Sequence, residues 1–160
     1  MENKRLMIIG DSISVGYGLQ KNEHSFVDML SELAGFHILL KAGCGDDIFS
    51  VISKLDKLNN HSNQCVIFIG TNGILKERQL IQLVRHIKRL TDRIILCNLL
   101  VDSSKNNIIK NVSIKENTLF CDLNLCFKGN SNLLRKDKIH PNNEGHYIIS
   151  VSYTHLTLPT

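Results

Sequence analysis

Short runs of consecutive apolar residues alternate along this chain with longer amphipathic segments. Most of these runs are continuously hydrophobic instead of alternating, which is typical of strands that are covered by helices on both faces. Such a series of βαβ units predicts an α/β fold with a mainly parallel sheet. We expect five strands, at Arg5–Ile9, His37–Leu40, Cys65–Ile69, Arg93–Leu99 and Thr118–Asp122.

Helices are predicted between these strands where apolar residues recur at helical spacing. The first begins after the cap residue Ser25 and ends at Gly35. The second carries its apolar face on Val51, Ile52, Leu55 and Leu58, and the third spans about Lys76 to Leu90. Opposite the apolar face of the third helix lies a basic stripe, which we interpret as solvated, made of Arg78, Arg85, Lys88 and Arg89.

Two later segments depart from this pattern. Residues 102–117 are polar and rich in Asn, Lys and Ser, so we expect a loop there with at most a short helix. A closing helix is predicted over Asn142–Ser150, but residues 151–160 are rich in β-branched side chains and end beside Pro159. We interpret residues 151–160 as a non-native tail and residues 1–150 as one domain, a hypothesis that sequencing of the 3′ end of the gene tests.

Composition is that of an ordinary globular protein. The chain has 160 residues, of which 42% are hydrophobic and 21% charged, and it has no apolar run long enough to span a membrane. The net charge is +4, from 19 basic and 15 acidic residues spread along the chain, so no nucleic-acid surface is indicated. Five cysteines without a C-x-x-C pair, and an N-terminal apolar run too short for a signal peptide, favour a cytoplasmic protein.

Several candidate site residues directly follow the predicted strands. Glycines follow the first three predicted strands, and ligands of open parallel sheets bind at the carboxyl ends of strands. Ser12 stands on the turn after the first strand, where it is either a nucleophile or a helix cap. Asn72, after the third strand, is either an amide donor to the same crevice or a simple turn residue.

A second cluster lies near the end of the chain. Asp137 precedes His140 by three residues on a loop that ends at Pro141, so the carboxylate can orient the imidazole as a general base. A surface ion pair is the alternative, and a metal site of Asp137, His140 and His146 is a weaker one. Serine, glycine N–H groups, an amide and an Asp-x-x-His pair together indicate acyl transfer.

The motifs resemble the four blocks of the SGNH/GDSL hydrolases, a family of esterases, lipases and thioesterases. The similar segments are Ile8–Gly18, Ala42–Asp46, Ile69–Asn72 and Asp137–Asn142. The resemblance implies a flavodoxin-like three-layer α/β/α sandwich with a five-stranded sheet and no metal or other cofactor. It also implies Ser12 as nucleophile, His140 as general base and then acid, and Asp137 as the residue that orients His140.

The same resemblance implies an oxyanion hole made by the backbone N–H groups of Ser12 and Gly45 and the side chain of Asn72. Gly43 is the alternative to Gly45, because the second block lacks its usual leading asparagine. Gly73 stands where the family has aspartate, which implies a short substrate loop and an open crevice.

We therefore expect a serine esterase or acylhydrolase that cleaves a small-molecule ester or thioester through an acyl-serine intermediate. The alternatives are a carbohydrate O-deacetylase of the same family and a catalytically silent flavodoxin-like binding domain.

Overall fold

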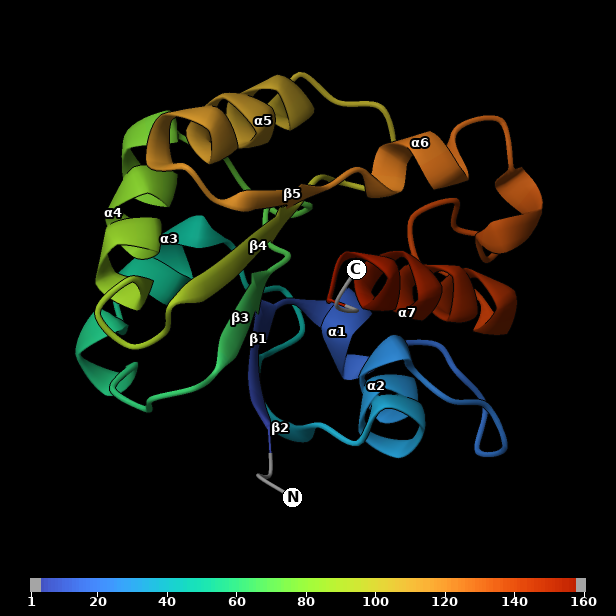
Figure 1. Cartoon of the computed structure of the whole chain (residues 1–160). Coiled ribbons are helices and arrows are strands. Elements are labelled where there is room, and N and C mark those ends of the chain that lie inside the picture. The colour runs from blue at the N-terminus through green and yellow to red at the C-terminus, as the bar shows by residue number, and fades with distance from the viewer. Residues whose placement is uncertain (1–3, 158–160) are drawn as a thin grey trace.

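A computed structural model describes residues 4–157, in which five parallel strands form one sheet in the order β2-β1-β3-β4-β5 (Figure 1). This is the flavodoxin-like strand order, in which the chain first winds to one side of β1 and then to the other. The predicted fold class is therefore confirmed. The strands are β1 (Arg5–Gly10), β2 (His37–Ala42), β3 (Gln64–Ile67), β4 (Arg93–Cys97) and β5 (Leu119–Cys121).

Two helical layers cover the sheet (Figure 1). One layer holds α1 (Ser12–Val15), α2 (Phe26–Ala34), α6 (Leu123–Phe127) and α7 (Asn143–Thr157). The other holds α3 (Ile48–Ile52), α4 (Glu77–Ile87) and α5 (Lys105–Glu116). Short 3₁₀ helices follow at η1 (Leu55–Lys57) and η2 (Ser131–Leu133). No helix within the described part of the chain is long and apolar enough to cross a membrane.

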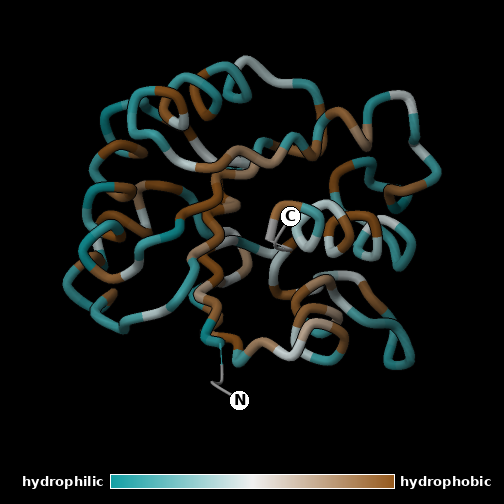
Figure 2. Tube along the Cα trace, in the orientation of Figure 1, coloured by the Kyte–Doolittle hydropathy of each residue, from teal (hydrophilic) through white to brown (hydrophobic). Residues whose placement is uncertain are grey.

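The sheet is hydrophobic on both faces, which explains the continuous apolar runs (Figure 2). In β1, Leu6 and Ile8 join the core cluster under α2 and α7. Their neighbours Met7 and Ile9 point to the other face and join the cluster under α4 and α5. Because successive side chains of a strand alternate between faces, a strand buried on both sides needs apolar residues at every position.

The first predicted helix has the ends expected from the sequence. Ser25 caps α2 by accepting from the backbone N–H of Asp28, whose carboxylate accepts in return from the N–H of Ser25. Gly35 ends the helix with φ of 71°, a left-handed conformation that glycine adopts without strain. The second predicted helix is split, because α3 begins earlier, after Asp47, and η1 follows as a separate turn.

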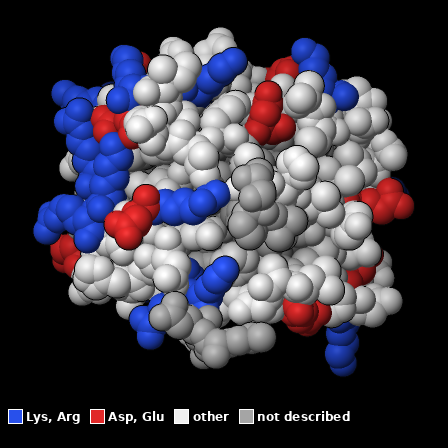
Figure 3. Space-filling model, viewed as in Figure 1, with Lys and Arg blue, Asp and Glu red and all other residues white. Residues whose placement is uncertain are grey.

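Residues 105–116 form α5, so the predicted loop with at most a short helix is wrong. The buried residues of α5 recur at helical spacing and are Ile109, Val112, Ser113 and Glu116. Because two of these four are polar, the hydrophobic pattern of the sequence does not show the helical period. Glu116 accepts from Arg85 of α4 at 3.0 Å and from Lys88, the residue that follows this helix, at 3.1 Å. Half of the basic stripe therefore binds a carboxylate of α5, and basic residues gather on the side where α4 lies (Figure 3).

Helix α7 runs on through Thr157, so the predicted helix end at Ser150 is wrong. Tyr153 is buried in the core, and its hydroxyl donates to Oε1 of Gln64 at 2.5 Å. Arg93 donates to the carbonyl of Leu156 at 2.7 Å. Contacts of Tyr153 and Leu156 therefore join this extension of α7 to the rest of the fold. Residues 158–160 lie outside the described range, and the non-native origin of the segment stays a prediction.

His146 on α7 is expected to make stability depend on pH. Its ring is fully buried, and its Nδ1 accepts from the backbone N–H of Phe26 at 3.0 Å. Burial lowers the pKa of His146 to about 4, whereas an unfolded histidine titrates near 6.5. Between these values only the unfolded chain binds the proton, so the free energy of unfolding decreases as the pH falls through this range, by about 3 kcal/mol at most.

Urea unfolding at pH 7 and at pH 4.5 measures this dependence. His146→Gln keeps an acceptor for the N–H of Phe26 but does not titrate. In this variant the free energy of unfolding should decrease much less between pH 7 and pH 4.5 than in the wild-type protein. An equally large decrease in the variant would mean that groups other than His146 cause the pH dependence of stability.

Candidate active site

The candidate site lies at the carboxyl end of β1, where the chain turns at once into α1. Asp11 caps α1, and its carboxylate accepts from the N–H of Ile13 at 2.9 Å. Gly10 makes the turn possible, because a Cβ at this position would lie 2.2 Å from Oγ of Ser14. The turn leaves Ser12 half-buried at the first position of the helix.

Ser12, His140 and Asp137 form one chain of hydrogen bonds. Oγ of Ser12 lies 2.9 Å from Nε2 of His140, although 128 positions separate the two residues. Nδ1 of His140 lies 2.6 Å from Oδ2 of Asp137. The structure thus brings together the three residues that the sequence singled out, in the order of a nucleophile, a base and a carboxylate that orients the base.

The loop that carries Asp137 and His140 is held closed at its base. Leu134 and Pro141 form an antiparallel bridge, and the N–H of Arg135 donates to the carbonyl of His140 at 2.8 Å. Oδ1 of Asp137 accepts from the N–H groups of Ile139 and His140 at 2.9 and 3.0 Å. The imidazole therefore has a fixed position relative to Ser12.

Partial burial by itself raises the pKa of Asp137. The hydrogen bonds from the backbone N–H groups of His140 and Ile139, and from the His140 ring, outweigh it and lower the pKa to about 2. The carboxylate is thus ionised at neutral pH and can only accept. A neutral His140 then carries its proton on Nδ1, which leaves the lone pair of Nε2 directed at Ser12.

Beside His140 lies an open hollow of about 530 Å³, lined by Tyr17, Arg135, Lys136 and Asp137. The Tyr17 ring centroid is 4.6 Å from that of His140, and Arg135 donates to the carbonyl of Gly18. Tyr17 and Arg135 were not singled out from the sequence. The signal that could have found Tyr17 is its place beside two glycines in the first block.

The loops after β2 and β3 meet beside this site. Nδ2 of Asn72 donates to the carbonyl of Asp46 at 3.1 Å, so the loop after β3 contacts the glycine loop after β2. Gly45 has φ of 82° and no atom near the position of a Cβ, whereas a Cβ on Gly43 would lie 2.9 Å from Oδ2 of Asp46. The roles of Ser12, Gly45 and Asn72 as oxyanion donors stay predictions.

The alternative metal site is wrong. His146 does not face the site, because its Nδ1 accepts from the N–H of Phe26 on α2. Among residues 4–157, no group of three His, Cys, Asp or Glu side chains is placed to hold a metal ion.

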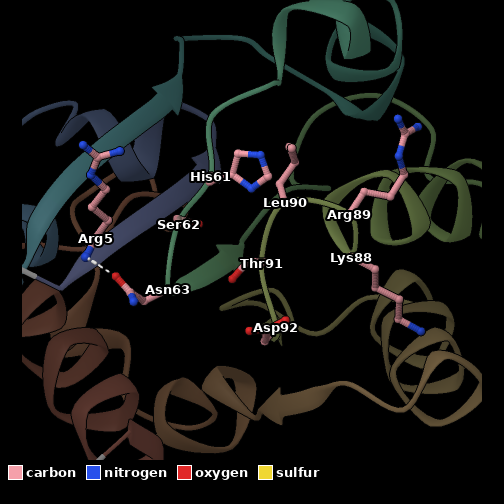
Figure 4. Close-up of a pocket in the computed structure, with 9 residues that line it drawn as sticks. All are labelled: Arg5, His61, Ser62, Asn63, Lys88, Arg89, Leu90, Thr91 and Asp92. Carbon is pink, nitrogen blue, oxygen red and sulfur yellow. Dashed lines mark hydrogen bonds between the residues drawn. The ribbon is translucent and has the colours of Figure 1, made fainter.

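Another cavity, of about 380 Å³, lies at the amino ends of the strands, on the side opposite the candidate site (Figure 4). It is lined by Arg5, His61, Ser62, Asn63, Lys88, Arg89, Leu90, Thr91 and Asp92. The charged groups of Arg5, Lys88 and Arg89 diverge in Figure 4 and do not point toward a common centre. The cavity therefore has no convergent set of groups for an anion.

No family model and no curated protein matches the chain. Solved structures do. Axe2, an acetylxylan esterase from Geobacillus stearothermophilus, matches with a TM-score of 0.76 and 18% identity over 96% of this chain and 94% of that one. TesA matches with a TM-score of 0.80 and 17% identity over 95% and 97%.

A lipolytic protein of the G-D-S-L family from Desulfitobacterium hafniense DCB-2 matches with a TM-score of 0.77 and 20% identity over 96% of this chain and 99% of that one. The matches extend over nearly the whole length of each protein. The chain therefore has the fold of the GDSL/SGNH hydrolases.

Proposed function

We propose that the protein is a serine hydrolase that cleaves carboxylic ester or thioester bonds. The observation that carries the proposal is the hydrogen-bonded chain from Ser12 through His140 to Asp137. Nε2 of His140 takes the proton of Ser12 as Oγ attacks the acyl carbonyl, and Asp137 stabilises the imidazolium. The proton then passes to the leaving alcohol or thiol. His140 next activates a water molecule, which hydrolyses the acyl-serine and restores Ser12.

The oxyanion of each tetrahedral intermediate is assigned to the N–H groups of Ser12 and Gly45 and to the amide of Asn72. In support, β2, β1 and β3 are neighbours in the sheet, so the loops after them share one edge. One proton of the Asn72 amide is donated to Asp46, which leaves the other for the substrate. Preorganised donors of this kind account for a large part of the rate in acyl transfer.

The structural neighbours support this reaction class. Axe2 structures described as catalytic mutants carry alanine in place of a serine, an aspartate or a histidine. These are the three residue types that form the hydrogen-bonded chain here. A catalytically silent binding domain would need His140 to be displaced from Ser12, and the 2.9 Å separation speaks against it.

The hollow beside His140 favours a polar substrate with a short acyl group, as a carbohydrate O-deacetylase would take. Three of its four lining residues are charged, and only Tyr17 offers an aromatic surface. The loop after Asn72 is short, since α4 begins at Glu77. An apolar acyl chain gains about 0.8 kcal/mol for each buried methylene, and these residues give it little to pack against.

The acetyl, butyryl and octanoyl esters of p-nitrophenol test both the reaction and its acyl preference. We expect hydrolysis of the acetyl ester, and a kcat/KM for the octanoyl ester at least about tenfold lower. A kcat/KM that rises with chain length would favour a long-chain acylhydrolase. Failure to hydrolyse any of the three, by folded protein, would contradict the proposal.

We propose that the protein is cytoplasmic and that its partner is a small-molecule ester or thioester substrate. All five cysteines are unpaired, as is usual where thiols are kept reduced.

A further inference from the structure

We propose that Lys105 is a positioning residue that holds the loop carrying Asn72 in the geometry of the oxyanion hole. This inference rests on the proposed function. Lys105 is the first residue of α5, and its Nζ donates to the carbonyls of Gly70 at 2.6 Å and Gly73 at 2.7 Å. The carbonyl of Thr71 lies at 3.5 Å from the same nitrogen. The ammonium thus binds the loop on both sides of Asn72.

The loop needs such a contact because its own residues do little to fix it. Gly70 has φ of 133° and Gly73 has φ of 65°, conformations that glycine adopts freely but that it also leaves freely. Hydrogen bonds from a charged donor are shorter and roughly twice as strong as neutral ones. Two such hydrogen bonds from the same Nζ atom hold the carbonyls of Gly70 and Gly73 in fixed positions relative to each other.

Lys105 is available for this task. It takes part in none of the ion pairs formed among residues 4–157, so no carboxylate draws its charge away from the loop. Lys115, on the same helix, pairs with Glu77 instead. An ammonium has three protons, and the three carbonyls of the loop account for all of them.

The start of α5 is itself anchored to the sheet. Oδ1 of Asn106 accepts from the N–H of Leu99 at 2.8 Å, just beyond β4, and its Nδ2 donates to the carbonyl of Val101 at 3.2 Å. On the other side of the loop, Asn72 donates to the carbonyl of Asp46. Asn72 therefore lies between two fixed points, the glycine loop after β2 and the ammonium of Lys105.

Loss of the hydrogen bonds from Lys105 should weaken stabilisation of the transition state more than it weakens substrate binding. The oxyanion develops only as Ser12 attacks, so a donor aimed at it contributes to kcat and little to KM. A misplacement of about 1 Å at a catalytic group can cost up to roughly 10²-fold in rate. Lys105 acts through Asn72, so its effect should disappear when the Asn72 amide is absent.

A double-mutant cycle with p-nitrophenyl acetate tests the inference. Lys105→Met is expected to lower kcat about tenfold and to change KM less than about twofold. Asn72→Ala alone should lower kcat by roughly 10²- to 10³-fold. In the Asn72→Ala background, Lys105→Met should cause no further loss. Lys105→Arg keeps a cationic donor and should recover part of kcat.

Lys110→Met is the matched control, because Lys110 is an exposed lysine on the same helix. It should keep the wild-type kcat. If circular dichroism shows that Lys105→Met is unfolded at the assay temperature, Lys105→Gln replaces it in the cycle. Equal losses from the Lys105 substitution in both backgrounds would indicate a general structural role and overturn the inference.

A wild-type kcat in the folded Lys105 variant would also overturn it, while leaving the proposed function intact. Absence of ester hydrolysis by the wild-type protein would instead overturn the proposed function, and the inference with it.

Discussion

Replacing Ser12 by alanine is expected to lower kcat for ester hydrolysis by roughly 10⁴- to 10⁶-fold. In the proposed mechanism Oγ is the nucleophile that forms the acyl-enzyme and the group whose proton His140 takes, and the substitution removes it. The fold should be unaffected. Ser12 is half-buried, and α1 is capped by Asp11, not by Ser12.

Steady-state hydrolysis of p-nitrophenyl acetate measures kcat, and thermal unfolding measures Tm, which should shift by less than about 2 °C. Ser53→Ala is a suitable control, since Ser53 is an exposed serine whose hydroxyl bonds only within its own turn. It should retain the wild-type kcat. An Ser12→Ala variant with more than a few per cent of wild-type activity would show that another residue attacks the ester.

Asp137→Asn is expected to lower kcat by about 10⁴-fold while leaving the loop in place. The amide oxygen can still accept from the N–H groups of Ile139 and His140, which Oδ1 of Asp137 binds now. The amide nitrogen would then face Nδ1 of His140 as a donor. Nδ1 would have to accept, and the imidazole proton would move to Nε2, where it faces Ser12 and blocks proton transfer.

The same assay measures this loss, and raising the pH should not restore the rate, because the amide does not titrate. Thermal unfolding shows whether the loop has kept its packing. A loss smaller than about tenfold would mean that Asp137 does not set the tautomer of His140.

The sheet could be predicted from the sequence because its central strands, β1, β3 and β4, are buried on both faces. Each of the five strands contains a run of consecutive apolar residues, and each begins within one residue of its predicted start. The predicted strand ends were less accurate than the starts: β3 and β4 end two residues earlier than predicted, and β2 continues two residues further, to Ala42, with a half-buried lysine at position 41. A strand at the edge of the sheet is only partly covered, so its hydropathy does not mark where it ends.

Helix α5 could not be predicted by the same signal. Its buried face includes Ser113, which donates to the carbonyl of Thr118, and Glu116, which is bound by two cations at the end of α4. These partners lie elsewhere in the structure, so a polar residue that is buried with its partner looks in the sequence like an exposed one. The end of α7 was missed because the burial of Tyr153 depends on contacts with Gln64 of β3 and with Phe36, not on local periodicity.

The three residues of the hydrogen-bonded chain were predicted because each belongs to a recognisable motif. Lys105 belongs to none, and a single lysine in a polar segment gives no sign that it binds two glycine carbonyls far away in sequence. Tyr17 likewise contacts His140 only in the folded chain. Groups that act by position, without chemistry of their own, become visible only when the fold is known.

Labelling with a fluorophosphonate, which modifies activated serine nucleophiles, tests the central claim most directly. After labelling and digestion, mass spectrometry identifies the modified residue. We predict a single adduct on Ser12, which is absent from the Ser12→Ala and His140→Ala variants. A folded wild-type protein that stays unlabelled, or that carries the adduct on another serine, would contradict the assignment of Ser12 and His140 as nucleophile and base.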